Sequence, residues 1–417
     1  MLEVEQALAK VLECALPLAP ESVPLMASLG RVLAVDVSSP EDLPPFDNSA
    51  MDGFALPLAG ATAAAGSEFD VAGEQAAGDA AQGLNVACEI MTGARLPTGL
   101  DAVVPVEQTE VLSRDGAGRA LRIRVGSDVR VSQHVRRRGE DIASADPVLS
   151  AGSRIGPTQL MLLAGLGVAQ LSLRPQPRVA LFCTGRELVD DPAQPLASGQ
   201  IRNNNAPYLR ARIVAAGAEL IAYRTIPDDV SVFVGELRLA LAAGAQVLIS
   251  TGAVSMGRYD FVPDALRELG AQIVFHKVRM RPGKPILFAR LPSGQLYFGL
   301  PGNPASSAVG LRFFVEPLLR VLLGLPREKP LLLPLAEAAR KAAGFKMFQK
   351  ARVEVHSGAR LQVRLLAGQE SFKVRPLTQA NAWAALPEDA DVLPAGTEVE
   401  VYAPDHWGWP WAAAEHT

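Results

Sequence analysis

The spacing of apolar and polar positions changes along the chain and predicts regions of different structure. Apolar residues between Leu8 and Ala15 recur at i, i+3, i+4 and i+7, which predicts an amphipathic helix near the N-terminus. Residues 39–45 are rich in proline, and we expect an extended hinge there. Residues 46–144 then carry short alternating runs between turn formers, which is typical of a small, mostly β module.

Strand and helix patterns alternate from residue 175 onward. Short apolar runs that predict buried strands lie at 178–183, 219–223 and 246–250. Helical patterns lie at 205–217, 228–244, 260–269 and 305–323. This alternation predicts a central sandwich with a mainly parallel sheet and helices on both faces. After residue 331, alternating runs predict a small terminal β-barrel or sandwich.

One stretch has almost the length of a membrane span. No charge lies between Arg154 and Arg174. However, Pro157 suits a helix start, and Gly165 and Gly167 interrupt the run. We therefore expect a buried helix followed by a strand, and no membrane partner.

Composition narrows the class of protein. A chain of 417 residues exceeds what one hydrophobic core usually serves, so we expect two to four domains. The 40 basic and 44 acidic residues give no general attraction to nucleic acid. The three cysteines are far apart and form no C-x-x-C pair, so we expect a reduced, cytosolic protein without a zinc site. The acidic N-terminus does not resemble a signal peptide.

Polar residues collect where the predicted strands of the central sheet end. One strand leads into 184–187, the next into Asp228-Asp229, and the third into the small, hydroxyl-rich run 250–257. Small residues let backbone N–H groups approach an anion, and a following helix N-terminus favours negative charge. The alternative is a tight turn that caps the helix through Ser255 or Asp260.

A second cluster strengthens the anion prediction. Arg281 and Lys284 flank Pro282-Gly283, and the run 299–304 places two prolines around a Gly-Asn pair. Such prolines fix the backbone while its amides stay free, and fixed cations suit a dianion. The alternative for the cations is a solvated hairpin charge.

Three carboxylates are expected at the same edge of the sheet. Glu187, Asp228 and Asp260 each follow a predicted strand, and carboxylates beside a phosphate site ordinarily hold Mg²⁺. The alternative for Asp228 or Asp229 is helix capping.

Several separate motifs together resemble one family, the molybdopterin molybdenumtransferases of the MoeA type, which are related to the C-terminal part of gephyrin. The motifs occur in the family's order as PPFDNSAMDGFA, IMTGARLPTGLDAVVPVEQ, RRRGEDI, CTGRELV, STGAVSMGRYDFV, RPGKP and GLPGNPASS. The resemblance covers nearly the whole chain.

The resemblance implies an elongated, four-domain homodimer. An N-terminal domain of residues 1–44 plus 145–174 would carry the β module 45–144 as an insertion. A molybdopterin-binding α/β domain (175–326) and a C-terminal β-barrel domain (327–417) would follow. The implied reaction takes adenylylated molybdopterin and molybdate, inserts the molybdenum and releases AMP, with Mg²⁺ as cofactor. The upstream adenylyltransferase is an implied partner.

The resemblance also assigns roles to matching residues. Catalytic or charge-stabilising roles fall to Asp260, Glu187, Asp52, Thr92, Arg136, Asp141, Arg281 and Lys284. Ligand-binding roles fall to Thr251, Gly252, Ser255, Gly257, Pro301, Gly302, Asn303 and Ser371. The metal would be held by Asp260, Glu187 and Asp228. Asp52, Thr92, Arg136 and Asp141 would complete the site from the other subunit.

The chain departs from the family pattern at three positions. Arg186 stands where an acidic residue or asparagine is usual, Ala253 replaces a glycine, and Arg281 replaces a lysine. The methyl group of Ala253 would crowd a turn of positive φ.

Two other functions remain open from the sequence. A molybdopterin adenylyltransferase shares the central α/β domain, although the additional β module and C-terminal domain argue against it. A non-catalytic scaffold like gephyrin is the other alternative.

Overall fold

The computed structural model describes residues 1–80, 82–254, 261–356 and 358–409. The chain forms two compact units. The larger unit consists of Met1–Glu21, Gly30–Ala34 and Leu173–Thr417, and the smaller unit of Ser22–Leu29 and Val35–Ser172. The finer division into four domains stays a prediction.

A six-stranded sheet forms the centre of the larger unit. Its strand order is β16-β13-β17-β21-β20-β18. Their bounds are β13 Arg178–Thr184, β16 Glu219–Ile226, β17 Val247–Thr251, β18 Gln272–His276, β20 Leu287–Arg290 and β21 Leu296–Leu300. The first three pairings are parallel and the last two antiparallel. The prediction of a mainly parallel sheet is therefore confirmed.

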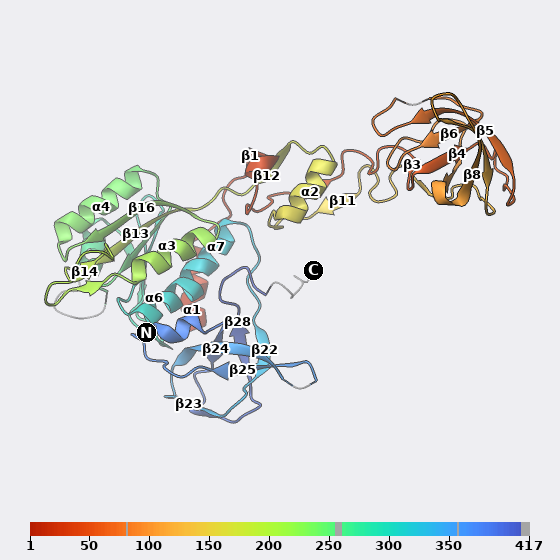
Figure 1. Cartoon of the computed structure of the whole chain (residues 1–417). Coiled ribbons are helices and arrows are strands. Elements are labelled where there is room, and N and C mark those ends of the chain that lie inside the picture. Colours follow the sequence, from red (N-terminus) through yellow and green to blue (C-terminus); the bar gives the residue numbers. More distant parts are fainter. Residues whose placement is uncertain (81, 255–260, 357, 410–417) are drawn as a thin grey trace. The chain divides into compact units, whose positions relative to one another are not determined.

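Helices cover both faces of this sheet. Their bounds are α1 Val4–Glu13, α3 Asn205–Ala215, α4 Val230–Ala242, α5 Val262–Glu268, α6 Pro304–Gly310 and α7 Glu316–Leu322. Val179 and Leu181 of β13 pack into the core with α1 and α3, while Ala180 and Phe182 pack with α4 and α5. Figure 1 shows α4 and α3 on opposite sides of β13. Because alternate side chains of β13 enter opposite cores, its sequence is a continuous apolar run.

The helix expected at 305–323 is interrupted. A π-helical turn, η3 Leu311–Val315, separates α6 from α7. Pro317 has no backbone N–H to donate four residues back, so a strictly α-helical ladder is lost there. The helix expected at 305–323 is therefore confirmed, with a π-helical turn inside it that the sequence did not predict.

The C-terminal part of the larger unit is a small barrel. Its strands are β22 Leu331–Pro334, β24 Lys346–His356, β25 Arg360–Leu365, β26 Ala382–Leu386 and β28 Glu398–Tyr402. They follow the order β25-β24-β26-β28-β22. A bridge between Leu335 and Val363 brings the end of β22 back to β25 and closes the circle. The remaining elements are β19 Met280–Arg281, which pairs with β24, the pair β23 Ala339–Arg340 and β27 Val392–Leu393, and η4 Arg375–Thr378.

The smaller unit contains the predicted β module. Its sheet has the order β7-β4-β6-β5-β9-β8. The bounds are β4 Gly53–Leu56, β5 Glu68–Gln75, β6 Ala87–Ile90, β7 Ala102–Pro105, β8 Thr109–Arg114 and β9 Ala120–Val125. The other elements of this part are β1 Glu21–Pro24, η1 Leu25–Ala27, β2 Val37–Ser38, β3 Asn48–Ser49, η2 Val106–Gln108, β10 Val135–Arg136, β11 Pro147–Leu149, α2 Pro157–Gly165 and β12 Gln170–Leu173.

The uncharged stretch after Arg154 forms α2 and β12, so the predicted helix followed by a strand is confirmed. The prediction that this helix is buried was wrong, because within α2 only Leu163 is buried and Met161 is 74% exposed. Among the described residues, no helix has both the length and the apolar character that a membrane crossing needs.

The proline-rich segment 39–45 bends rather than running fully extended. Leu43 donates its amide to Ile142 O at 2.8 Å, and Gly139 donates to Pro44 O at 2.9 Å. The Asp42 carboxylate also pairs with Arg138. The chain enters the β module through residues 39–45 and leaves it through residues 138–142. These bonds join the two connections, which run side by side.

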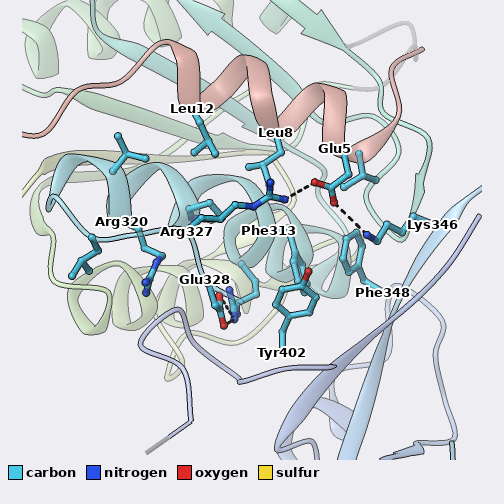
Figure 2. A pocket seen from close by; sticks show the side chains of 15 residues that line it. Glu5, Leu8, Leu12, Phe313, Arg320, Arg327, Glu328, Lys346, Phe348 and Tyr402 are labelled. Atoms are coloured by element: carbon cyan, nitrogen blue, oxygen red, sulfur yellow. Dashed lines mark hydrogen bonds and ion pairs between the residues drawn. The ribbon is translucent and has the colours of Figure 1, made fainter. Parts of the chain in front are cut away.

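Ion pairs hold α1 against the barrel and the helix that leads to it. Figure 2 shows Glu5 between Arg327 and Lys346, at 2.5 and 3.3 Å. Below them, the fully buried Arg312 donates to both carboxylate oxygens of Glu328 and to Ala403 O. A cavity of only about 70 Å³ remains between these elements. Ion pairs join charged side chains that line this cavity. We therefore interpret the cavity as part of the structural contact between α1 and the barrel.

The burial of Arg312 predicts a large effect on stability. Arg312→Met should lower the free energy of unfolding of the larger unit by about 3–5 kcal/mol, because it leaves Glu328 without its partner and the buried Glu316 with Arg212 alone. Urea unfolding followed by tryptophan fluorescence measures this, since the tryptophans of the described residues, Trp383, Trp407 and Trp409, lie in this unit. The control Arg327→Met removes an exposed pair and should cost less than about 1 kcal/mol. Equal losses in both variants would contradict the interpretation.

Candidate functional site

A cleft of about 580 Å³ opens at the carboxyl ends of β13, β17 and β21. Its lining combines small residues, amides and carboxylates from several segments: Thr184, Gly185, Glu187, Leu188, Ile201, Arg202, Asn203, Asn204, Asn205, Asp228, Thr251, Gly252, Ala253, Gly302, Asn303, Pro304 and Phe372. Ligands of open α/β sheets bind at this edge of the strands. We call this cavity the strand-end cleft.

The floor of the strand-end cleft depends on a close approach of two backbones. The Thr184 hydroxyl donates to Thr251 O at 3.0 Å. Gly252 follows with φ +89°, and a Cβ atom there would lie 2.7 Å from the Thr184 hydroxyl and 2.8 Å from its carbonyl oxygen. Only glycine fits this position, because any side chain would collide with Thr184.

The loop after β21 presents free amides to the strand-end cleft. The Asn205 side chain donates to Gly302 O at 2.7 Å, and the Ser307 hydroxyl donates to Pro301 O. Within the described residues, the amides of Gly302 and Asn303 donate no hydrogen bond. A fixed loop with free N–H groups is suited to an anion, as the sequence predicted.

The structure separates the two neighbouring aspartates. Asp229 caps α4 by accepting from the Val232 amide at 3.0 Å, whereas Asp228 lines the strand-end cleft with Glu187. Helix capping is therefore the role of Asp229, whereas ligand binding by Asp228 stays a prediction. The predicted residues Asp260, Ser255 and Gly257 lie outside the described residues.

Two carboxylates suit a magnesium ion that is shared with a phosphate. In the described part of the chain, no group of three or more His, Cys, Asp or Glu side chains gathers as a metal site. Mg²⁺, however, is commonly bound through one or two carboxylates plus the phosphates of a substrate. Glu187 and Asp228 therefore fit this ion, while a site made entirely of protein ligands is not seen.

The sequence analysis missed Asn203 as a structural support of the strand-end cleft. It follows β15 Ile201–Arg202, which pairs with β14 Leu188–Val189. Its buried side-chain amide donates to Asp190 Oδ1 at 2.9 Å and to Thr225 Oγ1 at 3.2 Å, and its oxygen accepts from the Ala206 amide. The run Asn203-Asn204-Asn205 before a helix was the signal that could have indicated it.

A second cavity of about 330 Å³ holds the predicted cations. Its lining consists of Arg281, Pro282, Gly283, Lys284, Pro285, Ser306, Met347, Phe348, Gln349, Gln369 and Ser371. The Arg281 guanidinium lies 4.5 Å and the Lys284 ammonium 5.8 Å from the centre of the Phe345 ring. We call this cavity the cation cavity.

The cations of this cavity differ from a neighbouring arginine. Arg279 pairs with Glu3 at 3.0 Å, whereas Arg281 and Lys284 form no ion pair with any carboxylate in the described ranges. Both side chains are exposed to solvent, which agrees with the alternative that they are only solvated charges of a hairpin. However, both also line the same cavity. Two unpaired cations beside hydroxyl and amide groups suit a small oxyanion.

One loop of the barrel borders both cavities. Ser371 lines the cation cavity, and the next residue, Phe372, lines the strand-end cleft. The Ser371 carbonyl accepts from the Ala305 amide of α6 at 2.9 Å. The cavities are therefore neighbours, although they share no lining residue.

This loop, residues 366–373, is organised by the buried Lys350. The ammonium group of Lys350 donates to the carbonyl oxygens of Gly368, Glu370 and Lys373 at 2.8–3.3 Å. The Gln369 side chain exchanges further hydrogen bonds with the backbone of Lys350. A buried ammonium requires such partners, so the loop has little freedom to move away.

The predicted residues of the smaller unit lie on neighbouring segments. The Asp52 carboxylate accepts from the Thr92 amide at 2.6 Å and from its hydroxyl at 2.9 Å. Arg136 pairs with Asn48 of β3, and the loop after Thr92 bonds to the same strand. Arg136 and Asp141 are exposed.

These hydrogen bonds predict how Asp52 titrates. The Thr92 amide and hydroxyl hold the pKa of Asp52 below its usual range. Both bonds should persist above the ordinary aspartate pKa of about 3.9 and be lost only as pH falls through the lowered pKa. In Thr92→Val, the pKa should rise toward the usual value but stay below it, since the amide bond remains. An NMR titration of the carboxyl group tests this, and an unchanged pKa would contradict it.

The departure at Ala253 has the conformational consequence that the sequence predicted. Its φ is +51°. Ala253→Gly should stabilise the larger unit by about 0.5–1 kcal/mol, because the relief of a left-handed alanine exceeds the gain in unfolded-chain entropy. Ala193→Gly, in an exposed loop without positive φ, should instead be destabilising. Urea midpoints that move in the same direction for both variants would refute this.

Comparisons with known proteins agree with the geometry over the full length. Residues 2–167 match the MoeA N-terminal region (domain I and II), 180–321 the probable molybdopterin binding domain, and 333–403 the MoeA C-terminal region (domain IV).

Among curated proteins, the chain is 41% identical to the molybdopterin molybdenumtransferase of Synechococcus elongatus over 406 residues, covering 95% of this chain and 97% of that protein. It is 33% identical to that of Haemophilus influenzae over 413 residues, covering 97% and 99%. A crystal structure of a molybdopterin biosynthesis MoeA protein from Pyrococcus horikosii superimposes with a TM-score of 0.78 at 28% identity, covering 98% of this chain and 100% of that one. From its sequence, its fold and these relatives together, the chain belongs to the molybdopterin molybdenumtransferase family.

Proposed function

We propose that this chain inserts molybdenum from molybdate into adenylylated molybdopterin and releases AMP. Family membership supports the coarser statement, that it is a transferase of molybdenum cofactor biosynthesis. The observation that carries the finer proposal is the pair of neighbouring cavities. One offers free amides and carboxylates for a phosphorylated ligand, and the other offers two unpaired cations for an oxyanion.

The strand-end cleft binds the phosphates of the substrate. The amides of Gly302 and Asn303 donate to phosphate oxygens, and the small residues Thr251 and Gly252 let the ligand approach the backbone. Glu187 and Asp228 hold Mg²⁺, which supplies positive charge to the phosphates when it is bound.

The cation cavity binds molybdate. Arg281 and Lys284 neutralise the tetrahedral dianion, and the hydroxyls of Ser306 and Ser371 donate to its oxygens. Because Ser371 and Phe372 are consecutive, a ligand that extends along this loop reaches from one cavity to the other. Molybdate is thereby kept beside the dithiolene end of a molybdopterin whose phosphates lie in the strand-end cleft.

The active enzyme is a cytoplasmic homodimer with site residues from both subunits, and the upstream adenylyltransferase supplies its substrate. Asp52 and Thr92 of the partner, with the exposed Arg136 and Asp141, complete each site. This part of the proposal is supported by the matching motifs PPFDNSAMDGFA, IMTGARLPTGLDAVVPVEQ and RRRGEDI, and by the exposure of Arg136 and Asp141.

An assay of AMP release tests the function directly. The purified chain is mixed with adenylylated molybdopterin, Mg²⁺ and molybdate, and AMP is quantified by chromatography. We expect AMP release that depends on molybdate. Binding of the substrate without any AMP release would instead favour a scaffold, and ATP-dependent adenylylation of molybdopterin without molybdate would favour an adenylyltransferase.

The cation cavity predicts a separation of kinetic effects. Lys284→Gln should raise the KM for molybdate about 10- to 100-fold, because a hydrogen bond to a charged group contributes about 1.5–3 kcal/mol. The KM for adenylylated molybdopterin should change much less. The control Arg352→Gln removes an exposed cation of the barrel outside both cavities and should leave both constants unchanged. An unchanged molybdate KM in Lys284→Gln would remove this residue from oxyanion binding.

The shared site predicts rescue between inactive subunits. Glu187→Gln and Asp52→Ala should each lose most activity as pure variants. After subunit exchange, each mixed dimer should regain one of its two sites, about half of the wild-type activity, because that site then contains neither change. Exchange is followed with two affinity tags. Complete exchange without any recovery would mean that each site is built within one chain.

A further inference from the structure

A small apolar cavity adjoins the strand-end cleft. It has a volume of about 170 Å³ and shares Asn204, Asn205 and Pro304 with the cleft wall. The rest of its lining comes from Tyr208, Val374, Leu377 and Thr378. The polar cleft therefore continues into a region of predominantly apolar character, which suits a ligand with one charged end and one apolar, planar end.

Phe372 stands at the edge of the cleft on the same loop. Its side chain is 65% exposed although it lines a cavity whose other walls are mainly polar. Burying a phenylalanine side chain contributes about 1.5–3 kcal/mol, so leaving its ring in water forgoes that stabilisation. Val374, two residues further, is exposed as well and lines the apolar cavity. Phe372 and Val374 are thus both exposed to solvent, and they line adjoining cavities.

The backbone that carries Phe372 is fixed by its surroundings. The carbonyls on either side of it, those of Glu370 and Lys373, both accept from the buried ammonium of Lys350. The Ser371 carbonyl is bound to α6. The exposed ring is therefore carried by a tightly bonded backbone, and a loop that is already ordered binds a ligand with less loss of entropy.

We propose that Phe372 and the apolar cavity beside it form the subsite for the planar heteroaromatic ring of the ligand whose phosphates occupy the strand-end cleft. This inference rests on the proposed function and adds a specificity-determining residue to it. The ring stacks on the phenyl face, and the exposed side-chain amide of Asn204 meets its polar edge. Stacking of a base on an aromatic side chain contributes about 1–3 kcal/mol.

Two rings of the proposed substrate share this chemistry, the adenine and the pterin. Direct binding separates them without any turnover. Isothermal titration measures the affinity of the full-length protein for AMP and, separately, for a phosphorylated pterin, in wild type and in Phe372→Ala, Phe372→Leu and Phe372→Trp. Leu332→Ala is the matched control, since it removes an exposed apolar side chain from the same barrel, outside the cleft.

Phe372→Ala should weaken the binding of one of the two probes about 5- to 100-fold, which is the stacking contribution converted to affinity. Phe372→Leu should recover only part of the affinity, Phe372→Trp should recover it fully, and Leu332→Ala should change nothing. The affected probe identifies the ring. Unchanged affinity for both probes in Phe372→Ala, or full recovery by leucine, would overturn the proposal.

The proposed function is judged separately by AMP release in the wild type. If the wild type releases AMP and Phe372→Ala keeps its KM and both affinities, only the ring subsite is wrong. If the wild type releases no AMP while Phe372→Ala still loses affinity for one probe, the ring subsite stands and the proposed reaction is wrong.

Discussion

The register of three parallel strands is the constraint on which the site depends. Cys183 pairs with Thr251, and Thr251 pairs with Leu300, so β13, β17 and β21 end at the same level. The residues that follow each strand must then emerge side by side at one edge. The Thr184 hydroxyl and Gly252 bring two of these segments into direct contact. A side chain at position 252 would separate them and close the floor on which a ligand is expected to rest.

A second constraint couples the barrel to this edge. The buried Lys350 lies on β24, at the start of which β19 attaches the segment that carries Arg281. The same strand therefore organises both the segment that carries Arg281 and the 366–373 loop, which together line the cation cavity. This explains how a domain more than a hundred residues away in sequence from Thr251 contributes Ser371 and Phe372 to the neighbourhood of the cleft. Because the buried Lys350 ammonium is bonded to three carbonyl oxygens of the loop, the loop can shift little without breaking these hydrogen bonds.

The sequence predicted the parts of this arrangement that depend on local pattern. The apolar runs of β13 and β17, the helix caps and the glycine turns have strong periodicity or turn chemistry, and they lie where expected. The distinction between Asp228 and Asp229 could not be made, because it depends on which side of a helix N-terminus each carboxylate faces. The division into two cavities, the role of Lys350 and the exposure of Phe372 depend on contacts between distant segments, which no local pattern records. The π-helical turn at η3 was not predicted, because the single Pro317 does not by itself distinguish such a turn from a regular helix.

Anomalous diffraction at the molybdenum absorption edge tests the central claim most directly. Crystals of the full-length protein soaked with molybdate and AMP should show one strong molybdenum peak among Arg281, Lys284 and Ser371, with the AMP phosphate at the amides of Gly302 and Asn303. A molybdenum peak at those amides, or the absence of any peak in the cation cavity at saturating molybdate, would contradict the assignment of oxyanion and phosphate to separate neighbouring cavities.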